Sequence, residues 1–225
     1  MRHRNPARLC VLLGAVGAQA ADLPLADGAG VNLPVHSIKA LRFMSTIHQQ
    51  YDFSCGSAAL ATLLTYHYGF PTSETSAFQA MWESGDQQKI RREGFSLLDM
   101  QRYLGSLGFQ ADGFSLPLRT LIEARLPAIV LITERGYNHF VVIKGAEDGR
   151  VLLGDPSSGT RSVTQAHFES VWPTRLLFVI HASPTRPQFN LTADWRAAPR
   201  APLSDAVART ALDGPGLPKF GPGEF

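Results

Sequence analysis

The sequence has only two cysteines, a net charge of +2 and no apolar run long enough to cross a bilayer. The small charge, with no basic stripe interleaved with aromatic residues, argues against nucleic-acid binding. No H-E-x-x-H or C-x-x-C motif occurs, so we expect no metal and no cofactor. The G-x-x-x-x-G-K-S/T loop that holds nucleotide phosphates is also absent, so we expect no ATP-binding domain in this chain. With 225 residues, 44% of them hydrophobic, one domain of ordinary size with extensions is expected.

Residues 1–20 have the pattern of a secretory signal peptide. Basic residues come first, an apolar stretch of about ten residues follows, and Ala18-Gln19-Ala20 matches a signal-peptidase site. A helix of about ten residues is too short to span a bilayer. We therefore expect a mature chain that begins at Ala21 and is periplasmic or secreted. The alternative is an uncleaved N-terminal membrane anchor.

Loss of this leader removes Cys10 and leaves Cys55 alone, so the mature chain forms no internal disulfide. The commonest role of a free cysteine is that of a small buried core residue. Cys55, however, lies between Ser54 and Gly56, where an extended approach turns into an apolar helix. Thiols at helix N-termini ionise readily and act as nucleophiles at neutral pH. The position therefore favours a catalytic cysteine.

Helical patterns fill the first half of the chain and strand patterns the second, which is typical of an α+β fold. The pattern predicts helices over 56–68, 73–82, 96–105, 118–124 and 165–171, and strands over 109–114, 128–133, 139–143, 151–153 and 175–180.

The two ends of the chain differ from this body in composition. Residues 21–34 contain Gly and Pro without a period and predict a flexible lead-in, so the domain is expected to span 35–182. Residues 183–225 are rich in Pro and Gly and predict a C-terminal extension. The apolar residues of this extension that could pack back on the body are Phe189, Leu191 and Trp195.

A cysteine nucleophile needs a base and a group that orients the base. His139 begins an apolar strand and Asp155 follows the next one, with the turn-rich segment 144–150 between them predicting a hairpin. If Ile143 pairs with Val151, His139 and Asp155 are directly opposed, with Cβ atoms about 4.5–5.5 Å apart. The alternative is that Asp155 is an ordinary Asp-Pro turn residue.

The oxyanion of a tetrahedral intermediate also needs hydrogen-bond donors. Gln49 lies six residues before Cys55, and its side-chain amide could act with the backbone N–H of Cys55. Gln50 is adjacent, so the donor is uncertain by one residue, and either glutamine could instead be a solvated residue before a turn.

Taken together, Gln49, Cys55-Gly56-Ser57, Asn138-His139-Phe140 and Gly154-Asp155-Pro156 resemble the motifs of the peptidase C39 family. These papain-like cysteine peptidases trim double-glycine leaders from peptide precursors. The resemblance covers about residues 40–182. It implies a papain-like α+β fold, with N-terminal helices packed on a C-terminal antiparallel sheet. It also implies Cys55 as nucleophile, His139 as base, Asp155 as orienting group and Gln49 as oxyanion donor.

The resemblance is to exported C39-like proteins, some of which accompany the secretion of functional amyloid in Gram-negative bacteria. We expect a peptidase that hydrolyses an exported peptide or protein, after small residues such as Gly, through an acyl-enzyme, with a secretion system as a possible partner. Ser54 departs from the Asp that precedes the cysteine in many members. Two alternatives remain: an acyl transferase or amidase that uses the same residues, and a non-catalytic papain-like binding module that assists secretion.

Overall fold

The computed structural model describes residues 19–24, 30–35 and 37–198, and the chain divides into two units, Met1–Ala40 and Leu41–Phe225. In the first unit, β1 (Gln19–Pro24) and β2 (Gly30–Val35) form an antiparallel pair. The structure therefore has strands where a flexible lead-in was predicted; the alternation of Val31, Leu33 and Val35 is the period that a strand requires. The predicted signal peptide lies outside the described residues, except for its last two.

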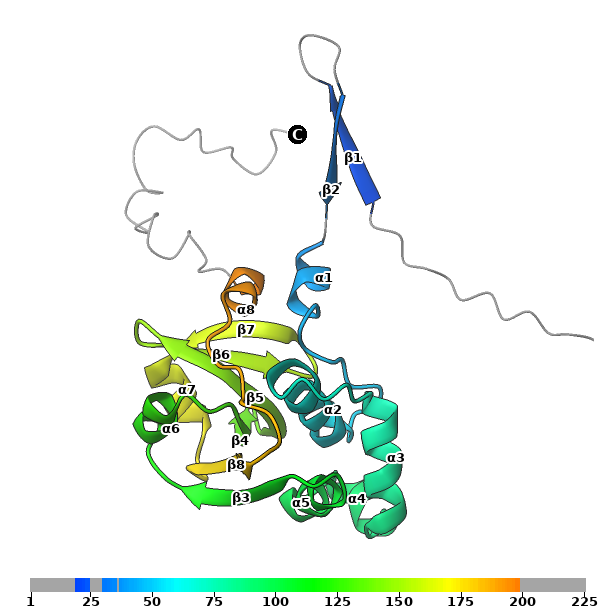
Figure 1. Cartoon of the computed structure of the whole chain (residues 1–225), viewed down its shortest axis with the longest axis vertical. Helices are drawn as coiled ribbons and strands as arrows, with labels where there is room; N and C mark the ends of the chain where they lie inside the picture. The colour runs from blue at the N-terminus through cyan, green and yellow to red at the C-terminus, as the bar shows by residue number, and fades with distance from the viewer. Residues whose placement is uncertain (1–18, 25–29, 36, 199–225) are drawn as a thin grey trace, which may run out of the picture. The chain divides into compact units, whose positions relative to one another are not determined.

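The second unit is built on one six-stranded antiparallel sheet with the order β3-β8-β4-β5-β6-β7 (Figure 1). Its strands are β3 (Gln110–Ser115), β4 (Ala128–Glu134), β5 (Tyr137–Glu147), β6 (Arg150–Asp155), β7 (Gly159–Thr164) and β8 (Leu176–Ala182). The helices are α1 (Ile38–Arg42), which crosses the boundary between the units, α2 (Cys55–Thr62), α3 (Glu74–Ser84), α4 (Gln87–Glu93), α5 (Leu97–Ser106), α6 (Leu118–Ala124), α7 (Gln165–Val171) and α8 (Thr192–Ala197).

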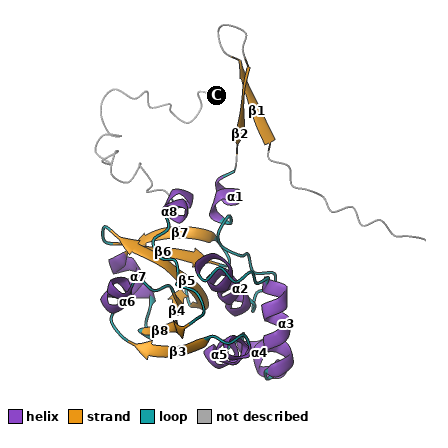
Figure 2. Ribbon diagram, viewed as in Figure 1, coloured by secondary structure: helices purple, strands orange, loops and turns teal. Residues whose placement is uncertain are grey.

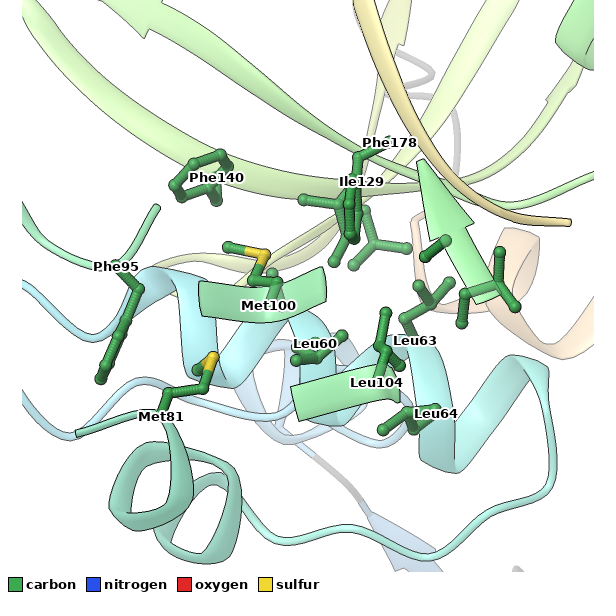
Figure 3. Packing of buried hydrophobic residues seen from close by; sticks show 14 of the residues in the cluster. Leu60, Leu63, Leu64, Met81, Phe95, Met100, Leu104, Ile129, Phe140 and Phe178 are labelled. Atoms are coloured by element: carbon green, nitrogen blue, oxygen red, sulfur yellow. The ribbon is translucent and has the colours of Figure 1, made fainter. Parts of the chain in front are cut away.

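Helices cover both faces of the sheet, with α2 to α5 on one side and α6 and α7 on the other (Figure 2). A buried cluster fills each side, and β5 contributes to both because its side chains alternate. Phe140 and Val142 pack on the α2 side, whereas Val141 and Ile143 pack on the α6 side. Figure 3 shows the first cluster, in which leucines of α2 and α5 meet β4, β5 and β8. Cys55 belongs to this cluster, so the sheet and the cysteine helix share one core.

Most of the predicted helices and strands are present, and these are the elements with strong local sequence signals. The cysteine helix ends in a π-helical segment η1 (Leu63–His67), and α5 begins with the Ser96–Asp99 capping box. Helix α4 and strand β7 were not predicted. Strand β7 has a single large apolar residue, Val163, and α4 has only Ile90, so neither carries a clear apolar period.

The predicted hairpin forms, but its turn and register differ from the prediction. The turn is only Asp148-Gly149, both with positive φ, as expected for a two-residue hairpin turn, and β5 continues to Glu147. Ile143 pairs with Leu153 and not with Val151. The difference arises from this short turn together with a β-bulge between Ile143 and Gly145.

The described part of the C-terminal extension, up to residue 198, packs within the second unit. Phe189 is buried in the second core cluster, and Asp194 in α8 is 1% exposed. Leu191 and Trp195 are half-buried. The folded body thus continues past residue 182, and the remainder of the predicted extension lies outside the described residues.

Candidate active site

Cys55 is the first residue of α2 and is 7% exposed. Ser54 precedes it but makes no side-chain cap: its Oγ donates to the Tyr51 carbonyl and accepts from the Tyr51 N–H. The hydroxyl therefore closes the turn before the helix and leaves the first N–H groups of α2 without this cap. Gly56 permits the close packing behind the sulfur, because a Cβ there would lie 2.8 Å from the Cε of Met100 and 3.1 Å from the Cβ of Phe95.

His139 and Asp155 meet at the ends of two neighbouring strands, β5 and β6. Their side chains are buried, and His139 Nε2 lies 2.7 Å from Asp155 Oδ1. The structure thus brings the predicted pair together, although the two residues are not directly opposed. Val142 pairs with Gly154, so Asp155 lies diagonally from His139, at a spacing that long side chains bridge.

The bulge at Lys144 determines that these two side chains share a face. Beyond the turn, Glu147 pairs with Arg150 and Gly145 with Leu152; continued without a shift, this register would place Val142 opposite Asp155. His139 would then point to the face opposite Asp155, because side chains alternate along a strand. The one-residue shift at Lys144 brings the side chains of His139 and Asp155 back to the same face of the sheet, so the bulge is part of the site.

The charges of this pair reinforce each other. Burial lowers the pKa of the His139 imidazole, but hydrogen bonds and charge from Asp155 and Cys55 outweigh this effect and raise the pKa to about 9. Burial raises the pKa of the Asp155 carboxyl, but His139 and Ser157 outweigh this effect and hold the pKa well below its usual range. At neutral pH the pair is therefore imidazolium and carboxylate.

The second ring nitrogen of His139 is available to Cys55. Nδ1 is buried and has no hydrogen-bond partner of ordinary geometry in the described part of the chain. Cys55 nevertheless contributes to the raised pKa of the imidazole through a hydrogen bond and through charge. One ring nitrogen thus holds the carboxylate while the other serves the sulfur, as cysteine nucleophiles require.

Asp155 is held by residues that sequence reasoning missed. Its Oδ1 accepts from the N–H and Oγ of Ser157, at 2.8 and 2.7 Å, and from the N–H of Ser158 at 3.3 Å. Its Oδ2 accepts from Arg161 Nε at 3.0 Å, and the rest of that guanidinium makes two bonds to Glu134. The serines follow an Asp-Pro pair, a recognisable turn signal, whereas Arg161 lies on the unpredicted strand β7.

Gln49 lies in the loop that leads to Cys55 and is tied to the Asp155 turn, because its backbone N–H donates to Pro156 O at 3.0 Å. Its Nε2 donates to Tyr51 O at 3.0 Å and to Asp52 O at 3.5 Å, while its Oε1 is buried without a partner in the described residues. Gln50 is exposed and its Nε2 reaches Thr75 Oγ1 at 3.4 Å. Of the two glutamines, Gln49 is the one joined to the site.

Tyr137 is a further neighbour of the site that the sequence did not suggest. Its Oη donates to Asp52 O at 2.8 Å, and its ring centroid lies 6.0 Å from that of His139. Burial, followed by the charges of Cys55 and Asp52, raises the pKa of its phenol. Tyr137 thus links the cysteine loop to the strand that carries His139.

Two hollows border the candidate residues of the site. One of about 720 Å³ is bordered by Tyr137, His139, Asp155 and the Glu134–Arg161 pair. The other, of about 250 Å³, is bordered by Cys55, Phe95 and Phe140 among others. Of these two hollows, the smaller one reaches Cys55 and the larger one reaches His139 and Asp155. In the described ranges, no group of three or more His, Cys, Asp and Glu residues could hold a metal, and no helix is long and apolar enough to cross a membrane.

Comparison with known proteins identifies the family of the chain. The sequence model of the family described as "Peptidase C39 family" matches residues 44–184. The chain is 41% identical over 165 residues to the "Probable functional amyloid protease FapD" of Pseudomonas aeruginosa, covering 72% of this chain and 73% of that protein. It is 39% identical over 170 residues to the protein of the same name from Pseudomonas fluorescens, covering 74% and 75%.

The peptidase domain of Streptococcus ComA, a bifunctional ABC transporter, has the same fold. The two superpose with a TM-score of 0.52 at 21% identity, covering 62% of this chain and 98% of that domain. The expected papain-like α+β fold is thereby confirmed. With more than half of its length matching the family, the chain is a cysteine peptidase that belongs to the peptidase C39 family.

Proposed function

We propose that this peptidase cleaves a peptide bond of an exported protein through an acyl-enzyme formed on Cys55. The observation that carries the proposal is the 2.7 Å hydrogen bond from His139 to the buried Asp155, together with the raised pKa of that imidazole. An imidazolium next to a sulfur stabilises a thiolate and supplies a proton to a leaving amine.

In the first half of the reaction, the Cys55 sulfur attacks the scissile carbonyl carbon and a C–S bond forms. The imidazolium of His139 gives its proton to the amide nitrogen, the C–N bond breaks and the amine departs. In the second half, the neutral imidazole takes a proton from water, and the oxygen attacks the thioester. The acid is released, and the thiolate and imidazolium return. Asp155 remains a carboxylate throughout and holds the ring by its Nε2–H.

The oxyanion is held by the backbone N–H of Cys55 and the side-chain amide of Gln49. The Gln49 amide already donates to two loop carbonyls, and the 3.5 Å bond to Asp52 O is the weaker of the two. Substrate binding exchanges this contact for the developing oxyanion. Such a donor is typically worth about 10²–10³ in rate.

The substrate class rests on the relatives. Proteins that cover nearly three quarters of this chain are named functional amyloid proteases. We propose an exported amyloid-associated protein or peptide as substrate, a periplasmic or secreted enzyme, and a secretion system as its partner. The leader pattern of residues 1–20 supports this location.

We also propose cleavage after a small residue such as Gly, which the resemblance to peptidases of double-glycine leaders supports. Phe95 and Phe140 border the hollow at Cys55, so these two rings would contact the substrate residues next to the sulfur.

The test is the pH dependence of Cys55 alkylation by iodoacetamide, with Cys55→Ala as the blank. The wild type should react rapidly at pH 6, and His139→Ala should lower that rate at least tenfold while the two rates converge above pH 9. If the rates of the two proteins coincide at every pH, the catalytic assignment is wrong. Secreted peptides from cells with wild-type protein and with Cys55→Ala then identify the cleaved bond by its new N-terminus.

A further inference from the structure

The segment Gln188–Ala198, here called the strap, follows the region that matches the C39 family, which ends at residue 184. It runs past β5 to α8 (Figure 1). The side chain of Phe189 anchors it in the second core cluster. The strap is therefore an addition to the matched domain that is nonetheless built into its core.

The strap completes the hydrogen bonding of β5 at the bulge. The ladder between β4 and β5 ends with the pair Ala128–Ile143. Directly beyond it, the Asn190 N–H donates to Lys144 O and the Asn190 Nδ2 to Ala146 O, each at 3.0 Å. The strap thus bonds β5 from the bulged residue onward, on both sides of Gly145. The contact is close, because a Cβ on Gly145 would overlap the Asn190 side chain.

The bulged side chain is held by a buried ion pair with the strap. Lys144 is 0% exposed, and its Nζ donates to Asp194 Oδ1 at 2.8 Å. The same amine donates to the carbonyl and Oγ of Ser45, at 2.8 and 2.7 Å, and Ser45 Oγ also donates to Asp194. The Lys144 amine reaches these three acceptors when Lys144 is the bulged residue of β5. We infer that the hydrogen bonds of this cluster favour the bulged register.

The strap also binds the end of the helical run that starts at Cys55. In η1, His67 O accepts from the Gln188 N–H and His67 Nδ1 lies 2.7 Å from Gln188 O. Burial and the charge of Lys144 lower the pKa of His67 to about 4, so its ring is neutral at pH 7 and donates from Nδ1. One short segment thus joins the cysteine helix to the histidine strand.

We propose that the strap is a positioning element of the peptidase centre: it fixes the Lys144 bulge, and with it the register that sets His139 beside Asp155. The positioning residues are Lys144 of β5 and Asn190 and Asp194 of the strap, and the side chains of Lys144 and Asp194 are buried. The proposal rests on the catalytic roles given to Cys55, His139 and Asp155 above. Without the strap, β5 and β6 can pair regularly, and His139 then turns away from its carboxylate.

The experiment uses the full chain and reads His139 directly, by NMR titration of its ring Cε1–H, alongside the rate of Cys55 alkylation at pH 7. Asp194→Asn removes the charge with little change of shape. Lys144→Met combined with Asp194→Asn removes both charges and so avoids an unpaired buried ion. Asn190→Gly keeps the backbone at φ 61°, which glycine tolerates, and deletes only the bond to Ala146 O. We expect the His139 midpoint to fall by at least one pH unit and alkylation to slow at least fivefold.

The matched control is Leu121→Ala in α6, which borders a hollow with Leu177 and Val179 of β8 and lowers the melting temperature by creating a cavity. It should leave the His139 midpoint and the alkylation rate at wild-type values. If the folded strap variants also retain wild-type values, the strap has a structural role only and the proposal is overturned. Coincident alkylation rates of the wild type and His139→Ala would instead overturn the catalytic assignment itself, so the two failures are distinguishable.

Discussion

Replacing Asp155 by Asn tests how far the charge of this carboxylate raises the pKa of His139. The structure raises the pKa of His139 from 6.5 to about 9. This difference in pKa corresponds to about 3.5 kcal/mol in favour of the imidazolium, at about 1.4 kcal/mol for each tenfold change in the protonation equilibrium. Asp155 is the largest of the causes that raise it, whereas burial opposes it. Because Asn keeps the shape but not the charge, the His139 pKa should fall to 6.5 or below.

The consequence is largest at mildly alkaline pH. At pH 8 an imidazole with a pKa near 9 is about nine-tenths protonated, and one with a pKa of 6.5 is about 3% protonated, a difference of about thirtyfold. The cleavage of a peptide at pH 8, which needs the protonated imidazole to release the amine, should fall by about this factor. The alkylation of Cys55 needs only the thiolate, so its rate should fall most at pH 6 and much less at pH 8. NMR titration of the seven histidines, with His139 assigned from the His139→Ala spectrum, measures the midpoint directly.

The control is Asp112→Asn, which removes the exposed carboxylate that bonds His181 and leaves the site untouched. It should change neither the His139 midpoint nor the reaction rates. If His139 in folded Asp155→Asn still titrates near 9, Asp155 is not the source of the shift and the electrostatic argument fails.

Three further predictions concern the surroundings of this pair. Arg161→Met removes the cation that bonds Asp155 Oδ2, so the carboxylate that orients His139 is held less firmly and peptide cleavage at pH 7 should fall, by less than in Asp155→Asn. Gly159→Ala should cost about 2–3 kcal/mol in urea unfolding, because Gly159 has φ +80° and a Cβ would lie 2.7–2.9 Å from atoms of Arg42. The stability that His139 contributes is fully present below pH 6.5 and is lost as the pH rises through about 9, so the difference in unfolding free energy between wild type and Asp155→Asn should shrink over that window.

Elements with strong local signals were predictable from the sequence. Helices α6 and α7 occupy the predicted ranges, and the Ser96–Asp99 capping box starts α5. The turn from Ser54 into the helix that starts at Cys55 also follows from the residues alone. In each case the residues that specify the structure are within four positions of one another, so neighbours in the chain determine it.

Features that depend on distant residues were not predictable in this way. Arg161 joins Asp155 to Glu134, but only the unpredicted strand β7 brings it there. The strap packs on β5 through Asn190 and Asp194, more than forty positions from Lys144. No local period records such contacts, because their energy is gained only after the sheet has formed.

The hairpin shows why a wrong register still paired the right residues. The assumed pairing of Ile143 with Val151 differs from the observed pairing with Leu153 by two positions, and a shift of two leaves every side chain on its own face. A shift of one would have turned His139 away from Asp155. The short Asp148-Gly149 turn by itself gives the register in which His139 and Asp155 lie on opposite faces, and the bulge at Lys144 shifts this register by one residue. The buried Lys144, at which the register shifts, is therefore as important for bringing His139 beside Asp155 as the turn that carries Asp155.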